Sequence, residues 1–468
     1  MARMKKEVRS VMMRFEGPQW AAGLEVLETL DRAGCEAYFV GGCVRDALLG
    51  RAAHDIDIAT SASPERVLGI FPDALPTGLK HGTVTVRRSG FFFEVTTFRQ
   101  EGGYSDGRRP DEVFFVRDVR EDLARRDFTI NAMAAGADGW IVDPFGGESD
   151  IREGRVRAVG DPAQRFGEDA LRIVRCVRFA AEFGFVIDEP TWDGVLAARD
   201  QLRLIAMERI GAELDKMGGG RDPGRAFELL LAAELPERFK SALPGAWLAS
   251  LRQAASGARG CEAATAPVAK TLSDGSAAAE QAWLAGGPAR AQGLARHMPD
   301  TADADLRWAA LMLAGGASSE AAEETMKLLH YASRRIKRVT DVIRLHISLQ
   351  ASDSGFEAWR RSWTMGVLDF GLAAAADWME LFRTQRMREA FDVPDALHAA
   401  VPEWTAAIPA VRIPELAVRG DRLAAASGKP PGPWIAKALR ELLERVAMRE
   451  LANDEAELLA AFLHRYNA

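Results

Sequence analysis

Cysteine is scarce in this chain, and long uninterrupted apolar runs are absent. Its 468 residues include four cysteines with no Cys-x-x-Cys spacing among them: Cys35, Cys43, Cys176 and Cys261. Thiols scattered in this way argue against a zinc site and against a disulfide-rich secreted fold. No run is long and apolar enough to span a bilayer, and residues 1–15 lack the apolar core of an export signal. We therefore expect a cytoplasmic protein with no membrane segment.

An excess of positive charge is missing as well. The chain has 60 Lys and Arg against 67 Asp and Glu, which gives a formal net charge of −7 at pH 7. Net charge therefore does not favour binding of a polyanion. If the protein binds nucleic acid, local clusters of arginine and lysine must provide the contacts, with the acidic excess elsewhere.

Apolar sequence, in contrast, is plentiful. Hydrophobic residues make up 48% of the chain, enough to bury several cores and to form three or four domains. Strand signals concentrate in the first part of the chain, and helical spacing takes over from Asp161 onward. This order predicts an α+β fold with a helical C-terminal part.

The segment from Tyr38 to Thr60 carries the strongest chemical signal. Its apolar start ends in Gly41-Gly42 and continues as Cys-Val-Arg-Asp-Ala-Leu-Leu, a pattern typical of a strand, a tight turn and a helix start. Two glycines let backbone N–H groups approach an anion, and a helix N-terminus adds partial positive charge. This part of the segment predicts a phosphate-binding turn.

Two carboxylates follow in the same segment. In a strand, alternate side chains share a face, so Asp55 and Asp57 would point one way while Ile56 and Ile58 enter the core. Their Cα atoms would lie roughly 6.5 Å apart, which suits carboxylates that hold two Mg²⁺ ions about 3.5–4 Å apart. A phosphate-binding turn beside paired carboxylates predicts nucleotidyl transfer.

Two further segments bear on this site. Residues 83–87 and 91–98 are expected to form a hairpin. Glu94 lies in the second strand, where it is either a third metal carboxylate or an edge-strand charge. The glycine- and charge-rich run 102–111 is either a surface loop or a lid over the site.

The motif Gly-Gly-x-Val-Arg-Asp, followed by Asp-Ile-Asp-Ile-Ala-Thr, resembles that of the DNA-polymerase-β-like nucleotidyltransferases. It looks most like their branch of class II tRNA nucleotidyltransferases and bacterial poly(A) polymerases. Residues 123–133 resemble the family's second motif, in which an Arg holds triphosphate and an Asp reads the ribose hydroxyl; Arg126 and Asp127 match these positions. The resemblance implies Mg²⁺ at Asp55 and Asp57. It also implies triphosphate binding by Gly42, Arg45 and Arg126.

Helical spacing begins near Arg165 and continues through Ala180. Residues three apart on a helix are offset by about 60°, so one side would carry Asp169, Arg172, Arg175 and Arg178. Three arginines on one arc without interleaved acids repel one another unless an anion lies among them; the alternative is a plain solvated face.

This run matches Glu-Asp-x-x-Arg-x-x-Arg-x-x-Arg of the class II tRNA nucleotidyltransferases. The resemblance implies that Asp169 and Arg172 present hydrogen-bonding edges to C or A, so that protein replaces a nucleic-acid template. Arg175 and Arg178 would support them by holding the nucleotide. Residues 204–214 resemble the family's fifth motif, on a helix that braces the reading helix.

The C-terminal half is less informative. Residues 254–295 are rich in Ala, Gly and Ser with little periodicity, so we expect a solvent loop or insertion. After Thr325 comes a basic cluster, which is either an RNA-backbone site or a solvated helix face: Arg334, Arg335, Lys337, Arg338 and Arg344. The last part of the chain resembles the tail of Bacillus-type tRNA nucleotidyltransferases more loosely.

These observations predict an N-terminal mixed β-sheet nucleotidyltransferase head followed by an all-α neck, body and tail. The predicted parts are an N-terminal extension (1–17), the catalytic head (18–160), a neck with the nucleotide-reading helix (161–225), a body with the insertion (226–324) and a tRNA-binding tail (325–468).

By resemblance, the protein adds CCA to the 3′ end of tRNA from CTP and ATP with Mg²⁺ and releases pyrophosphate; a homodimer is compatible with this. Enzymes that add only CC or only A stay open as alternatives. Bacterial poly(A) polymerases typically carry a basic stretch where this chain has Leu-Pro-Thr-Gly-Leu-Lys-His-Gly-Thr-Val at 75–84. A non-catalytic RNA-binding protein would have lost Asp55 or Asp57, and both are present.

Overall fold

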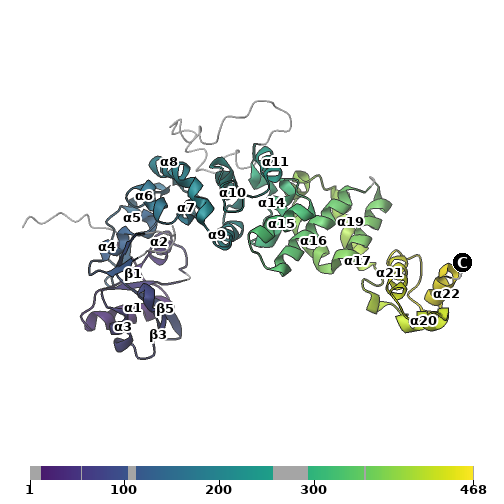
Figure 1. Cartoon of the computed structure of the whole chain (residues 1–468), viewed down its shortest axis with the longest axis horizontal. Helices are drawn as coiled ribbons and strands as arrows, with labels where there is room; N and C mark the ends of the chain where they lie inside the picture. The colour runs from purple at the N-terminus through teal and green to yellow at the C-terminus, as the bar shows by residue number, and fades with distance from the viewer. Residues whose placement is uncertain (1–11, 54, 104–111, 257–292, 353–354, 467–468) are drawn as a thin grey trace, which may run out of the picture. The chain divides into compact units, whose positions relative to one another are not determined.

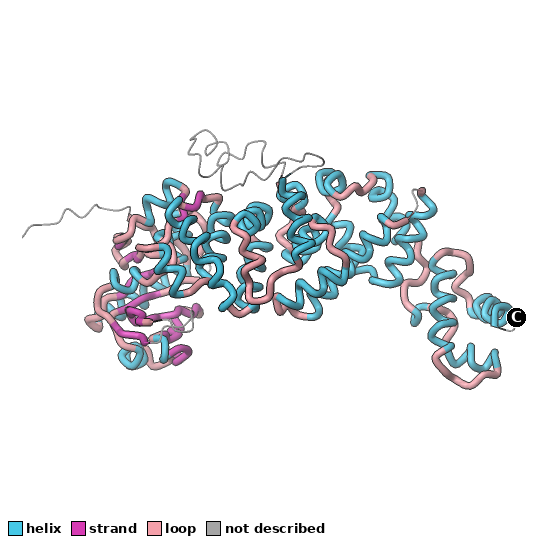
Figure 2. Tube along the Cα trace, turned by 45° about the horizontal axis from the view of Figure 1, so that its top comes forward, coloured by secondary structure: helices cyan, strands magenta, loops and turns pink. Residues whose placement is uncertain are grey.

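The computed structural model of the protein describes residues 12–53, 55–103, 112–256, 293–352 and 355–466. They form two compact units, and the division falls inside α10 (Pro223–Ala232). The first unit holds described residues 12–222 and 229–242, and the second holds 223–228, 243–256 and 293–466. All strands of the described residues belong to the first unit (Figure 2), which confirms the predicted α+β class.

A seven-stranded mixed sheet forms the head of the first unit (Figure 1). Its order is β3-β4-β5-β2-β1-β8-β9, and only β2 and β5 pair in parallel. The strands are β1 (Ala37–Val40), β2 (Ile58–Thr60), β3 (Leu75–Gly78), β4 (Thr83–Arg88), β5 (Phe91–Thr97), β8 (Ala134–Ala135) and β9 (Ile141–Val142).

Alternation along the strands decides which face of this sheet is covered. α1 (Pro18–Arg32) and α3 (Pro64–Ile70) pack on one face, where Phe39, Phe93 and Val95 are fully buried. On β5, the intervening residues Phe92 and Glu94 remain exposed. The β3–β5 end of the sheet therefore has one buried face and one that carries exposed side chains.

The predicted hairpin is confirmed as β4 and β5. Ser89 and Gly90 turn the chain with φ values of 50° and 85°, the sign of a tight hairpin turn whose twist matches that of the strands. β6 (Arg99–Gly102) and β7 (Glu112–Phe115) form a second, two-stranded sheet. Residues 104–111 of the predicted lid lie outside the described residues.

Short helices and a helical neck complete the first unit. They are α2 (Gly42–Leu48), α4 (Val119–Ala124), the 3₁₀ turns at Thr129–Asn131 and Arg199–Leu204, α5 (Gly147–Glu153), α6 (Pro162–Glu168), α7 (Leu171–Phe183), α8 (Glu189–Ala198) and α9 (Met207–Gly219). One parallel pair of two-residue strands, β10 (Arg155–Val156) and β11 (Val186–Ile187), joins the end of the predicted head to the predicted neck, and β11 lies where the sequence predicted helices alone.

The second unit is helical in its described part. Its elements are α11 (Gly245–Ser256), η5 (Leu294–His297), α14 (Ala304–Ala314), α15 (Ser319–Leu328), α16 (Ser333–Gln350), α17 (Phe356–Leu381), α18 (Gln385–Ala390), α19 (Asp395–Ala406), η6 (Ile413–Glu415), α20 (Gly420–Ser427), α21 (Trp434–Ala447) and α22 (Glu455–Tyr466). The predicted boundary at 325 lies inside α15, which packs against α16. Within the ranges that the structure describes, no helix is both long and apolar enough to cross a membrane.

Candidate functional site

The turn between β1 and α2 brings the backbone close to an arginine. Gly41 has φ 75° and ψ −126°, a conformation that L side chains rarely adopt. A Cβ on Gly41 would lie 2.6 Å from Arg126 Nη1, whereas a Cβ on Gly42 would meet Arg45 Nη2 at an ordinary 3.5 Å. Gly41 is therefore the glycine that this turn requires, and triphosphate binding by Gly42 stays a prediction.

Asp55 and Asp57 lie immediately before β2, because the strand itself begins at Ile58. The chain nevertheless alternates as predicted: Ile56 and Ile58 are buried, Asp55 is exposed and Asp57 is half-buried. The N–H of Val40 donates to the carbonyl of Asp57 at 3.0 Å. This bond anchors Asp57 beside the end of β1, next to the glycine turn.

Glu94 is the neighbour of Asp57 across the sheet. β2 and β5 pair in parallel with Ile58 opposite Val95, so the residues before them lie side by side. Burial raises the pKa of Asp57, the charge of Glu94 adds to this, and Arg126 opposes it. A divalent cation would relieve this negative charge, and carboxylate oxygens are ligands that Mg²⁺ takes. Still, no three acidic, histidine or cysteine side chains of the described residues are close enough to form a metal cluster, so Glu94 as third ligand stays a prediction.

The two arginines predicted to bind triphosphate differ in their free donors. Arg126 pairs with Asp122 at 3.3 Å, and its buried Nε has no hydrogen-bond partner. Arg45 is held through all three of its nitrogens by Asp46 and Asn131. Because buried donors are rarely left unpaired, an anion in contact with Arg126 would complete its hydrogen bonding. Arg45 mainly ties α2 to the turn at Asn131.

The carboxylate of Asp127 is occupied by hydrogen bonds from groups of the protein itself. Its Oδ1 accepts from Phe128 N at 2.8 Å and from Asn131 Nδ2 at 3.0 Å, and its Oδ2 accepts two bonds from Arg175 at 2.9 and 2.6 Å. Burial opposes ionisation of Asp127, but the charge of Arg175 and these hydrogen bonds outweigh burial and lower its pKa. Four bonds occupy the lone pairs of a carboxylate, so a ribose hydroxyl could bind only by displacing one of them.

The predicted reading helix is in fact two helices. α6 ends at Glu168, Asp169 has extended backbone (φ −148°, ψ 104°), and α7 begins at Leu171. The Asp169 carboxylate accepts from Leu171 N at 3.1 Å, a local bond that competes with helix formation at this point. The prediction that Asp169 lies on the same helix as the three arginines is therefore wrong. The break instead lets Asp169 form a two-bond ion pair with Arg209, at 2.7 and 3.3 Å.

Each arginine on this side of α7 has a carboxylate partner from outside the helix. The pairs are Arg172–Glu168 at 2.5 Å, Arg175–Asp127 at 2.6 Å and Arg178–Glu213 at 2.7 Å. The expectation that an anion lies among these arginines is met by carboxylates of the protein itself, so a bound external anion is not required to offset their repulsion. α9 supplies both Arg209 and Glu213, so the fifth-motif helix braces α7 as the resemblance implied.

These elements surround a cavity of about 500 Å³. Among the predicted site residues, those that line it are Gly42, Arg45, Asp57, Arg126, Asp169, Arg172, Arg175 and Arg178. Asp55 does not line it. Asp127, predicted to read the ribose hydroxyl, and Gly41 of the predicted phosphate-binding turn line it as well. The sequence indicated no site role for the other lining residues, which are Arg125, Asn131, Leu171, Phe179 and Arg209. Asn131 and Arg209 lie inside motifs that the sequence displays, and this was the signal that could have found them.

The basic cluster of α16 is largely neutralised within the second unit. Its ion pairs are Arg335–Asp305, Arg338–Asp303, Arg338–Asp377, Lys337–Asp341 and Arg344–Glu323. Arg334 alone among these five is exposed without an ion pair to any described residue. Most of this cluster therefore ties α16 to neighbouring helices and turns instead of forming a plain solvated face, and RNA binding by the cluster stays a prediction.

Two family models match the chain. The first, Poly A polymerase head domain, matches residues 37–157, which hold the sheet and the two aspartates. The second, tRNA nucleotidyltransferase domain 2, matches residues 301–462 in the second unit. The matches thus cover one part of each unit.

Individual relatives extend the likeness to nearly the whole chain. The CCA-adding enzyme of Lactobacillus helveticus is 51% identical over 214 residues, and here the chain spans about half of the relative (54%). The solved structure of the Bacillus stearothermophilus CCA-adding enzyme in complex with CTP covers 97% of this chain and 98% of its own, with 30% identity and a TM-score of 0.73. The Thermotoga maritima CCA-adding enzyme complexed with tRNA shares the fold at a TM-score of 0.57 and 18% identity. The CCA-adding enzyme of Geobacillus stearothermophilus is 36% identical over 450 residues, which are 96% of this chain and 98% of that protein. This chain therefore belongs to the family of CCA-adding enzymes.

Proposed function

We propose that this protein adds C, C and A to the 3′ end of tRNA from CTP and ATP and releases pyrophosphate. The observation that best supports the proposal is the cavity of the first unit. Its lining brings together Asp57, Arg126 with its unsatisfied Nε, Asp169 and Arg172. Such a space can take a nucleoside triphosphate with its phosphates near the first two groups and its base near the last two. A protein of this kind would act in the cytoplasm, where tRNA matures.

Nucleotidyltransferases of this family use a divalent metal, and the oxygen donors of Asp55 and Asp57 suit Mg²⁺. Bound there, Mg²⁺ would polarise the RNA 3′-hydroxyl and offset the charge of the departing pyrophosphate. Arg126 would bind the triphosphate by charge-assisted hydrogen bonds, and Gly41 leaves room for its guanidinium against the turn. Gly42 and Arg45 would shape that turn.

Asp169 and Arg172 would choose the base. A guanidinium donates and a carboxylate accepts, so together they can match the edges of C or A. In the structure, Asp169 is bound to Arg209, and Arg172 is bound to Glu168 and to the carbonyls of Arg125 and Arg165. Nucleotide binding would therefore exchange protein partners for base partners, while Arg175 and Arg178 stay fixed by their own ion pairs.

The deciding experiment uses pure protein, Mg²⁺ and two substrates, tRNA that lacks its last three nucleotides and tRNA that ends in CC, with labelled CTP, labelled ATP or both. Product lengths on a gel separate the alternatives. Addition of three nucleotides supports the proposal, and a stop after two indicates a CC-adding enzyme. Addition only to tRNA ending in CC indicates an A-adding enzyme. Long A tracts indicate a poly(A) polymerase. Folded protein that adds nothing would overturn all of these. The homodimer stays a prediction, to be checked by the mass in solution.

A further inference from the structure

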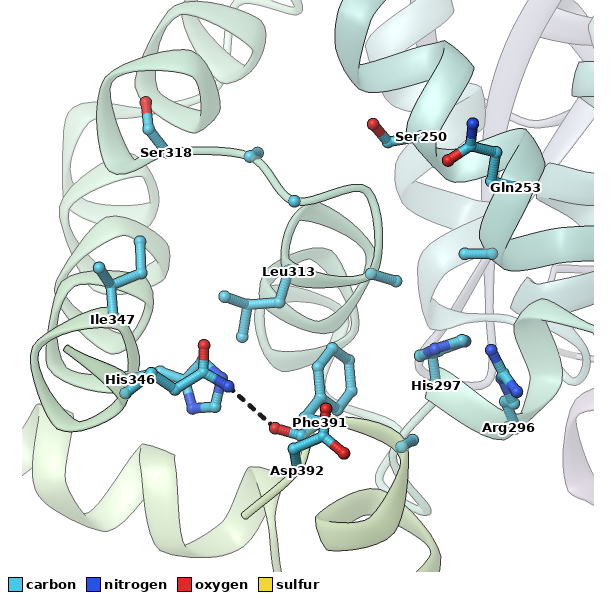
Figure 3. A pocket seen from close by; sticks show the side chains of 16 residues that line it. Ser250, Gln253, Arg296, His297, Leu313, Ser318, His346, Ile347, Phe391 and Asp392 are labelled. Atoms are coloured by element: carbon cyan, nitrogen blue, oxygen red, sulfur yellow. Dashed lines mark hydrogen bonds between the residues drawn. The ribbon is translucent and has the colours of Figure 1, made fainter. Parts of the chain in front are cut away.

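The second unit contains a cavity of its own, of about 600 Å³, with no predicted site residue in its lining. α11, η5, α16 and the segment between α18 and α19 surround it (Figure 3). A volume of this size is typical of sites that hold a small organic ligand.

Two buried polar groups at this cavity lack partners. His346 is 2% exposed, and its Nδ1 has no hydrogen bond. Burial lowers the pKa of His346 to about 4, so the imidazole is neutral at pH 7 and can both accept and donate. The buried Nε of Arg296 is also unsatisfied, and its guanidinium has no ion pair within the described ranges. Since buried polar atoms normally find partners, the cavity suits a ligand that supplies them.

An aromatic ring separates these two groups. Phe391 lies with its ring centroid 5.3 Å from that of His297 and 6.1 Å from that of His346. Figure 3 shows Arg296 and His297 on one side of Phe391 and His346 on the other. The cavity thus has a cationic end, a flat apolar surface and a neutral polar end, and Asp392, beside Phe391, adds a carboxylate to its lining.

We propose that this cavity binds a nucleotide, with its phosphate at Arg296 and its base against Phe391, one base edge reaching His346. A phosphate offers the guanidinium charge-assisted hydrogen bonds, and a base offers a flat face to the phenyl ring and polar atoms to the imidazole. The nucleotide is either free or one unit of a bound RNA strand, since both present the same chemistry. This site is separate from the first-unit cavity and does not rest on the function proposed there.

The test is calorimetric titration of the full chain with AMP and with adenosine. EDTA is present so that no metal ion supports nucleotide binding in the first-unit cavity. Arg296→Gln should weaken AMP binding at least about tenfold, the size expected for a lost charged contact, and leave adenosine binding unchanged. His346→Phe keeps an aromatic ring stacked on Phe382 but removes the nitrogens, so it should weaken both ligands. Arg334→Gln, an exposed arginine of the same unit, is the matched control. Thermal melting verifies that each variant is folded.

The proposal is overturned if AMP shows no saturable binding, if Arg296→Gln and the parent bind AMP equally, or if CTP at the first-unit cavity displaces all bound AMP. A second titration, with tRNA lacking its last three nucleotides, identifies the source of the nucleotide. If tRNA competes with AMP in the parent and this competition is lost in Arg296→Gln, the site binds a nucleotide of RNA. AMP binding that tRNA leaves unchanged assigns it to a free nucleotide.

Discussion

The partners of each charged side chain decide its role at the first-unit site. Arg45, Arg175 and Arg178 are held by carboxylates of the protein, and Arg126 keeps an unsatisfied donor. Asp57 lies half-buried beside Glu94, where its negative charge is unfavourable without a cation. Groups that keep an unsatisfied donor or an unfavourable charge are the ones available to substrate and metal.

Asp57→Asn should abolish nucleotide addition and leave the fold intact. The amide preserves size but lacks the charge that a divalent cation needs, so we expect a loss of at least about a hundredfold in kcat. Thermal stability should stay equal or rise slightly, because the substitution removes repulsion from Glu94. Asp73→Asn, at an exposed position, is the control. Near-parental activity of folded Asp57→Asn would show that this carboxylate holds no catalytic metal.

The two glycines of the turn should respond differently to alanine. Gly41→Ala places a methyl group 2.6 Å from Arg126 Nη1 at a positive φ, so we expect a loss of about 1–3 kcal/mol in the free energy of unfolding. Gly42→Ala meets only ordinary contact and should be nearly neutral. Urea unfolding of both variants measures this difference. If Gly41→Ala loses as little free energy of unfolding as the near-neutral Gly42→Ala, the turn tolerates a side chain at Gly41.

At the scale of elements, the break between α6 and α7 organises the site. It turns Asp169 toward Arg209 on α9, while α7 directs Arg175 to Asp127 and Arg178 to Glu213. Three segments distant in the chain are thus joined by ion pairs around one cavity. The arrangement ties the position of Asp169 to the packing of α7 on α9.

The ion pair between α7 and Asp127 should contribute strongly to stability. Asp127→Asn leaves Arg175 with only its longer ion pair to Glu213, at 3.9 Å, and we expect a loss of about 2–4 kcal/mol in the free energy of unfolding at pH 7. The folded-state pKa of Asp127 is lowered, so this contribution is present above the unfolded pKa of about 4 and is lost as pH falls through the folded value. Urea unfolding from pH 7 to pH 3 should show the gap between parent and variant narrowing on acidification. Asp193→Asn, exposed on α8, should show no such gap at any pH.

Disturbing the reading pair should alter base choice more than chemistry. Arg172→Ala removes the donor fork, so UTP and GTP should begin to be incorporated, with about 1–3 kcal/mol of discrimination lost. Arg178→Ala, on the same helix but paired with Glu213, should weaken the enzyme without changing which base is chosen. Single-nucleotide incorporation with each of the four triphosphates measures both. If Arg172→Ala loses activity uniformly and keeps its preference for C and A, the pair does not read the base.

At the scale of the whole molecule, the two units use charge in the same way. In both, acids from other elements neutralise the arginines of a helix, α7 in one and α16 in the other. The net charge of −7 is thus consistent with ion pairs that are mostly structural. Basic residues in a helix are therefore a poor guide to RNA contacts until their partners are known.

The distinction between structural ion pairs and residues free to contact RNA can be tested on α16. Arg338→Glu faces Asp303, Asp305 and Asp377 and should lower the free energy of unfolding by about 1–3 kcal/mol. Arg334→Glu, exposed and unpaired within the described part, should leave stability unchanged. Thermal melting compares the two, and filter binding of tRNA then reports on Arg334 alone. A stable Arg338→Glu variant would show that these ion pairs contribute little to the unit.

Local sequence alone determined a large part of this protein. The glycine turn, the alternation of Asp55–Ile58, the β4–β5 hairpin and the helical second half follow from backbone preferences and periodicity, which act over a few residues. The tertiary structure decided which charges are free, because the partners of Arg172, Arg175, Arg178 and Arg338 come from other elements. It also decided that Asp169 ends a helix and pairs with Arg209, and that Gly41 rather than Gly42 needs to be glycine. Ion pairs and close contacts between distant segments depend on packing, and no periodicity in the sequence records them.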